Sequence, residues 1–166
     1  MKKFLLLLFM LAIPFMAGAQ IRFGYFSYDT VLQSMTDYKL AQRSIDDLRM
    51  KYEAEMKRAE QDFNAKYEDF LEVQRDLVPS ILRKRQTELQ EMMDKNEAFR
   101  NDARQLLKQA EDDALAPVRR KLNEAVARVG SERGYAFVIN TDGNACPYVS
   151  PEMGEDATEA IKAAIK

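Results

Sequence analysis

The segment from Thr36 to Glu132 constrains the fold more than any other part of the chain. It contains no Gly before Gly130 and only two prolines, and it is rich in Lys, Arg, Glu, Gln, Leu and Ala, which favour the α-helix. Apolar residues recur along it in steps of three and four, so each half carries one apolar stripe on a helix face. The first stripe consists of Tyr38, Ala41, Ile45, Leu48, Tyr52, Met56, Ala59, Phe63, Tyr67, Phe70 and Leu77. The second keeps a heptad register through Leu82, Leu89, Met92, Phe99, Ala103, Leu106 and Ala110, then shifts by a stutter to Ala114, Val118, Leu122, Ala125 and Val129.

Pro79 divides this segment into two helices. A narrow stripe on a charged helix is not stable alone in water, so the two stripes are expected to cover each other. Pro79 cannot continue the first helix but suits the first turn of the second, whereas Pro117 is expected to kink the second helix without ending it. The sequence therefore predicts an antiparallel α-helical hairpin over residues 36–132, with its tip near residues 77–81.

The first 19 residues have the pattern of a secretory signal peptide. Lys2 and Lys3 precede an apolar run over residues 4–15, which is too short to span a bilayer, and residues 17–19 (Ala-Gly-Ala) are typical of a cleavage site. Cleavage after Ala19 leaves 23 basic and 27 acidic residues, a net charge of −4. The protein is therefore expected to be exported, and its charge argues against nucleic acid as a partner.

The remaining residues, 20–35 and 133–166, are expected to form a small β-rich base. Strands are predicted over residues 20–28, 136–139 and 145–149, and Asp156 is the predicted N-cap of a last short helix. So few short elements bury too little surface to be stable alone, so we expect the base to be an oligomer contact. The candidates for that contact are Ile21, Phe23, Tyr25, Phe137, Ile139 and Tyr148. The fold class is thus α+β, a long helical hairpin on a small sheet or barrel.

The composition argues against catalysis. The chain has no His and one Cys, which excludes His-based dyads, imidazole zinc sites and intrachain disulfides. Adjacent carboxylates such as Asp46 and Asp47 diverge by about 100° on a helix, so they make poor acid–base pairs. We expect neither an enzyme nor a protein that requires a cofactor or a metal.

Six short motifs stand in order around the predicted hairpin. They are Ile21-Arg22-Phe23-Gly24-Tyr25-Phe26, Asp29-Thr30-Val31-Leu32, Pro117-Val118, Ala125-Val126-Ala127-Arg128-Val129, Gly134-Tyr135-Ala136-Phe137-Val138-Ile139-Asn140 and Asp156-Ala157-Thr158. Their order resembles the Skp/OmpH family of periplasmic chaperones over essentially the whole chain after the leader. Asn140 and Ala157 stand where that family usually has an Asp and a bulky aliphatic residue.

The resemblance implies a homotrimer in which three protomers build a barrel-like base and three hairpins enclose a cavity. Unfolded outer-membrane proteins would be held there, in the periplasm and without ATP, until they are delivered for insertion. The best-known family members have basic hairpin tips. Residues 65–95 of this chain instead contain six bases and seven acids, so the family's electrostatic attraction of anionic clients or lipids does not carry over.

Methionine, aromatic and leucine side chains of the hairpin are the candidates for contact with such clients, because flexible thioethers and flat rings adapt to irregular partners. They are Met50, Tyr52, Met56, Phe63, Tyr67, Phe70, Leu71, Met92, Met93 and Phe99. A residue on an apolar stripe can equally pack in the hairpin seam. Met50, Leu71 and Met93, which flank the stripes, are therefore the stronger candidates.

Three further interpretations stay open at this stage. Arg83, Lys84 and Arg85 can contact lipid head groups or acidic clients, giving a weak membrane-surface contact, or can pair with Glu88 on a solvated helix face. Cys146 is expected to be a buried, unpaired thiol in a strand, with a disulfide between subunits as the alternative. For the whole protein, the alternative to a chaperone is a passive coiled-coil spacer or assembly factor of the cell envelope that binds one folded partner.

Overall fold

The computed structural model describes residues 21–165, and the predicted signal peptide with its cleavage after Ala19 lies outside them. The described residues form two compact units. One unit consists of residues 36–118, and the other combines residues 21–35 with residues 119–165. The structure is mostly helical with one small three-stranded sheet, as the predicted α+β class requires.

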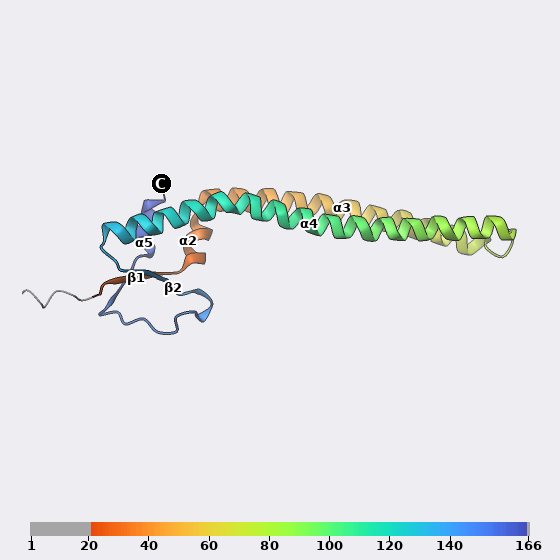
Figure 1. Ribbon diagram of the computed structural model, residues 1–166. Helices are drawn as coiled ribbons and strands as arrows, with labels where there is room; N and C mark the ends of the chain where they lie inside the picture. Colours follow the sequence, from red (N-terminus) through yellow and green to blue (C-terminus); the bar gives the residue numbers. More distant parts are fainter. Residues whose placement is uncertain (1–20, 166) are drawn as a thin grey trace, which may run out of the picture. The chain divides into compact units, whose positions relative to one another are not determined.

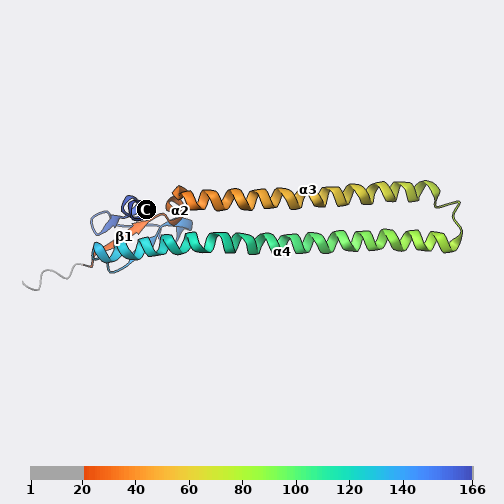
Figure 2. The same cartoon turned by 90° about the horizontal axis from the view of Figure 1, so that it is seen from above.

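Residues 36–118 form a helical hairpin. Helix α3 (Thr36–Val73) and the part of helix α4 (Pro79–Glu132) that belongs to this unit lie side by side and run in opposite directions (Figures 1 and 2). Pro79 is the first residue of α4, where its missing N–H would have had no helical partner anyway. Pro117 lies inside α4 without ending it, because the helix continues to Glu132.

The seam between the two helices follows most of the predicted stripes, with two corrections. Ile45, Phe70 and Ala103 are buried, whereas Tyr67 and Leu106, both predicted to face the seam, are nearly half exposed. Leu107 is half-buried in place of Leu106, so the register shifts between Ala103 and Leu107 rather than after Ala110. A straight helix drifts by about 20° per heptad relative to a 3.5-residue repeat, and an extra step of four corrects that drift.

The second unit contains a parallel sheet of three short strands. They are β1 (Phe23–Phe26), β2 (Val138–Asn140) and β3 (Gly154–Asp156), in the order β2-β1-β3. Tyr25 pairs with Ile139 on one side, and Phe23 pairs with Gly154 on the other. Strand β1 is therefore the central strand, and both of its partners come from the last third of the chain.

The prediction of a third strand over residues 145–149 is wrong, because these residues form an irregular loop after the 3₁₀ helix η2 (Asp142–Asn144). Pro147 has no N–H to donate to a strand ladder. The strand lies instead at residues 154–156, where Gly154 lets the ring of Phe23 approach. A Cβ atom on Gly154 would lie 2.5 Å from that ring.

The core of this unit is formed by helix α2 (Tyr28–Ser34), by helix α5 (Thr158–Ala164), which contacts α2, and by the last turns of α4. Its buried side chains are Phe26, Val31, Leu32, Met35, Leu122, Ala125, Val129, Ala157 and Ile161. Asp156, the predicted N-cap of α5, lies one residue before the cap position, which Ala157 occupies. Its carboxylate nevertheless accepts the N–H of Thr158 at 2.9 Å, so it satisfies a donor at the start of the helix.

Two polar side chains of the second unit tie η2 to the start of α2. The amide oxygen of Asn140 accepts the N–H groups of Tyr28 and Asp142, both at 3.1 Å. The carboxylate of Asp142 accepts the N–H of Asp29 at 2.7 Å. Hydrogen bonds from the Ser27 side chain and from the Asp29 backbone lower the pKa of Asp142.

Acid is expected to weaken this link. A carboxyl group whose pKa is lower in the folded state adds stability above its unfolded pKa of about 4, and that stability is lost as the pH falls through the folded pKa. Asp142→Asn should therefore be less stable than the parent at pH 6, and the difference should shrink toward pH 3. Urea unfolding at both pH values measures it, and a constant difference would contradict the role of the charge.

Candidate binding surface on the helical hairpin

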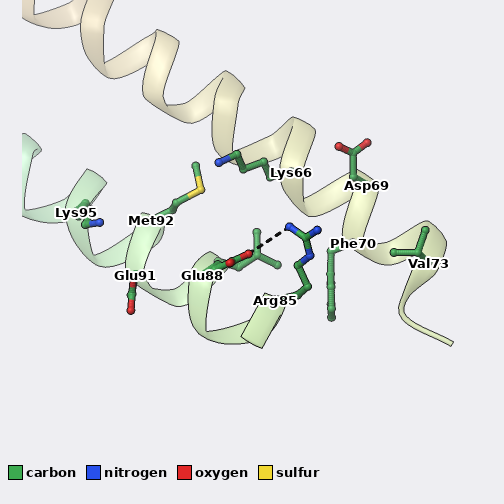
Figure 3. A pocket seen from close by; sticks show the side chains of 10 residues that line it. Lys66, Asp69, Phe70, Val73, Arg85, Glu88, Glu91, Met92 and Lys95 are labelled. Atoms are coloured by element: carbon green, nitrogen blue, oxygen red, sulfur yellow. Dashed lines mark hydrogen bonds and ion pairs between the residues drawn. The ribbon is translucent and has the colours of Figure 1, made fainter. Parts of the chain in front are cut away.

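A groove of the hairpin lies near its tip, between the end of α3 and the start of α4 (Figure 3). This tip groove has a volume of about 680 Å³ and is lined by Lys66, Asp69, Phe70, Val73, Arg85, Glu88, Leu89, Glu91, Met92 and Lys95. In Figure 3, Phe70 and Met92 point into the space between the helices, whereas Asp69 and Glu91 point away from it. The tip groove therefore has an apolar floor and a charged rim.

A second groove lies further along the same two helices. This middle groove has a volume of about 410 Å³ and is lined by Met56, Ala59, Glu60, Phe63, Asn64, Met93, Asn96, Glu97, Phe99, Arg100, Asn101 and Arg104. Its apolar side chains are two methionines and two phenylalanines beside small or polar residues.

The two grooves bring together six of the ten residues predicted to contact clients. Met56, Phe63, Met93 and Phe99 line the middle groove, and Phe70 and Met92 line the tip groove. The remaining four line neither groove and comprise Met50, Tyr52, Tyr67 and Leu71. Two of these pack against residues of the middle groove, because the ring centroids of Tyr52 and Phe99, and those of Phe63 and Tyr67, are 6.0 Å apart.

The residues predicted to flank the stripes are exposed to water. Met50 is 58% exposed, Leu71 44% and Met93 49%. Contacts within this chain therefore leave a large part of each side chain uncovered. Three further apolar residues at the tip, Val73, Val78 and Ile81, are exposed to a similar extent and were not predicted as contact residues. Their signal was available, because all three are apolar residues off the stripes within a few residues of Pro79.

The basic run near the tip is partly paired. Lys84 and Arg85 each form an ion pair with Glu88, at 3.7 and 3.3 Å, which corresponds to the solvated-face interpretation of this run. Among residues 21–165, Arg83 forms no ion pair. Exposed pairs of this kind contribute only about 0–1 kcal/mol, so they reduce the local charge more than they stabilise the helix.

One polar contact in the seam was not predicted. The side-chain amide of Asn96 donates to the carbonyl oxygen of Ala59 across the hairpin at 3.2 Å. Asn96 occupies a stripe position between Met92 and Phe99, and a polar residue at such a position favours one register over others. The break in the apolar pattern at Asn96 was the signal that could have identified this contact.

The predicted oligomer-contact residues lie in two environments. The rings of Phe23 and Phe137 stack at a centroid distance of 5.3 Å, and Tyr25 and Ile139 are half-buried register partners in the sheet. Ile21 and Phe137 are at least half exposed. Tyr148 is 78% exposed and lies in the loop rather than in the predicted strand.

Cys146 also lies in this loop. It is free and half-buried, and its thiol lies 3.3 Å from the carbonyl oxygen of Tyr148. The thiol is unpaired, as predicted, but the prediction that it is buried in a strand is wrong, because that strand does not form. Its alternative role in a disulfide between subunits stays a prediction.

Among residues 21–165, no helix is both long enough and apolar enough to cross a membrane. In the same part of the chain, His, Cys, Asp and Glu side chains form no cluster of three or more that could hold a metal ion.

Comparison with known proteins gives a family and a fold. The family model described as "Outer membrane protein (OmpH-like)" matches residues 22–165. A search of curated proteins found no match. Among solved structures, a candidate outer membrane chaperone (OmpH-like) from Caulobacter crescentus CB15 is similar, with a TM-score of 0.72 at 16% sequence identity. The alignment covers 90% of this chain and 86% of that chain, and at this identity it shows a shared fold.

The matched family is non-enzymatic, which confirms the expectation that this chain is not an enzyme. The family match spans both units of the structure, from the first strand to the last helix. The chain therefore belongs to the family of OmpH-like outer membrane proteins.

Proposed function

We propose that this protein is an ATP-independent holdase chaperone of the periplasm, which binds unfolded outer-membrane proteins and prevents their aggregation. Its family and the description of the Caulobacter crescentus structure as a candidate chaperone support this function. The observation that carries the proposal is the set of exposed apolar side chains along the hairpin, above all Met50, Leu71 and Met93. Each of them is at least 44% exposed, so all three remain available to a partner.

The chemistry of these side chains suits many weakly bound partners better than one specific partner. Methionine is flexible and polarizable, and surfaces rich in it adapt to different apolar sequences. The two grooves add half-buried Phe and Met side chains that a client segment can contact without unfolding the hairpin. A passive spacer would need neither feature, and its heptads would not have to shift as they do near Leu107.

The proposed holding site requires more than one copy of the chain. In each copy the sheet has three strands of three or four residues, and no other strand among residues 21–165 pairs with the outer edges of β2 and β3. Such a sheet gains stability when its edges and exposed apolar residues are covered. We propose that two further copies of the chain cover these edges, so that three bases join in a homotrimer and the three hairpins enclose the client. The candidate contacts between the bases are Ile21, Phe23, Tyr25, Phe137, Ile139 and Tyr148.

The proposal predicts that three exposed apolar residues are needed for holding. Met50→Ser, Leu71→Ser and Met93→Ser together should raise several-fold the concentration needed to suppress aggregation of a urea-denatured barrel protein after dilution. Each substitution removes apolar contact area worth about 1–2 kcal/mol if the side chain becomes fully covered. Light scattering of the diluted client measures the effect.

The matched control replaces three exposed polar residues of the same helices, Gln61→Ser, Gln86→Ser and Gln105→Ser, and should hold clients as well as the parent. Molar mass from light scattering should correspond to three chains and should rise by one client. Full suppression by the Met50, Leu71 and Met93 variant would contradict the assigned surface. A monomer that ignores the client would contradict the function itself.

A further inference from the structure

The tip groove is large enough to bind an apolar side chain from a partner. Its volume of about 680 Å³ lies within the range of about 300–1,000 Å³ usual for binding pockets. Phe70 is buried beneath it, Leu89 and Met92 are half-buried, and Val73 is 46% exposed at its edge. A side chain that entered the groove would therefore replace water over apolar atoms.

The charges around the tip groove favour neither an anionic nor a cationic partner. Three bases, Lys66, Arg85 and Lys95, stand beside three acids, Asp69, Glu88 and Glu91. Glu88 pairs with Arg85 and also with Lys84, just outside the groove. In Figure 3 the side chain of Lys66 extends over the groove, where its methylene stem adds apolar surface while its ammonium group stays in water. Exposed charges of both signs within about one Debye length cancel at longer range.

We propose that the tip groove binds one uncharged apolar side chain of an extended, unfolded client segment, and that it does so without regard to the net charge of the client. This inference rests on the proposed function and specifies how clients are recognised. A groove with an apolar floor and a rim of balanced charge best fits an apolar group that carries no charge. A groove built to attract anionic clients would carry a surplus of bases, which this one lacks.

The test uses the full chain and three blocked synthetic peptides of one extended apolar pattern, each with a single Trp and with a net charge of +3, 0 or −3. The chain contains no Trp, so the emission of the peptide reports only its own surroundings. Emission should shift to the blue on binding. The Kd of the three peptides should agree within about twofold, both with one another and between about 50 and about 500 mM salt.

Val73→Ser locates the binding site. Val73 is partly exposed, so its replacement should leave the hairpin folded, which circular dichroism checks. Losing its apolar contact should raise the Kd about five- to tenfold for all three peptides. The matched control, Leu106→Ser, replaces a residue that is 48% exposed and lines none of the grooves described above, and it should leave the Kd unchanged.

Several results would overturn the inference. These are a Kd that rises tenfold with salt, a preference for one sign of peptide charge, no binding, or equal binding by the Val73→Ser variant. A change in molar mass of that variant would show instead that the groove is a contact between copies of the chain. If the peptide test fails while the aggregation assay succeeds, the inference fails and the holdase function stands. If the aggregation assay fails, the function fails whatever the peptides do.

Discussion

Replacement of Leu122 by Ala is expected to lower the free energy of unfolding by about 3 kcal/mol, within the range of about 2–5 kcal/mol measured for buried leucines. Leu122 of α4 is completely buried in the same unit as Val31 of α2 and Ile161 of α5, which are also completely buried. Helices α2 and α5 have seven residues each, and α4 ends ten residues after Leu122. We expect them to close the cavity left by the smaller side chain only in part. Urea unfolding followed by circular dichroism measures the loss.

The control for this substitution is Leu106→Ala on the same helix. Leu106 is 48% exposed, so its truncation should cost less than about 1 kcal/mol. Both variants must be compared with the parent at one protein concentration, because self-association makes stability depend on concentration. Equal losses at the two positions would show that Leu122 is not in a tightly packed core.

Gly24→Ala is expected to destabilise the sheet by about 1–3 kcal/mol, the usual cost of inserting a methyl group where there is no space. An added Cβ atom would lie 2.7 and 2.8 Å from two ring atoms of Tyr135. Strand β1 cannot easily move away, because the Gly24 N–H donates to the carbonyl oxygen of Phe137 at 3.1 Å and the strand is paired on both sides. The loss should appear in the same unfolding experiment.

Gly130→Ala provides the opposite case. Gly130 lies within α4, and an added Cβ would meet only the Cγ2 atom of Val138 at an ordinary distance of 3.5 Å. Because Ala favours the helix and restricts the unfolded chain, this variant should gain about 0.5–1 kcal/mol. If Gly24→Ala proved as stable as the parent, the Tyr135 ring would have to move aside at little cost.

The helical part of the fold could be predicted because its signal is local. Steps of three and four define a helix face within any two turns, and Pro79 marks the only break in the pattern at which the chain can reverse. The error at Leu106 shows the limit of this signal. Leu106 and Leu107 are identical neighbours, and only the packing of the opposite helix decides which of them faces the seam.

The sheet was harder to predict because its pairing is not local. Residues 145–149 have the apolar content of a strand, but Pro147 weakens their pairing, whereas residues 154–156 (Gly-Glu-Asp) carry no strand signal of their own. Strand β3 forms at Gly154 because the ring of Phe23 lies where any larger residue would place its side chain. On the hairpin, the exposure of Met50, Leu71 and Met93 could be inferred from periodicity. The tip groove could not, because it depends on how side chains from two helices fill the space between them.

The parallel arrangement of the sheet also determines the order in which the chain can fold as it is synthesised. Strand β1 is made more than a hundred residues before either strand that pairs with it. The hairpin contains all of its own partners, so it can close as soon as its second arm has emerged, while β1 still waits with open edges. A newly made copy therefore passes through a stage in which its hairpin can already be closed while its central strand still lacks both partners.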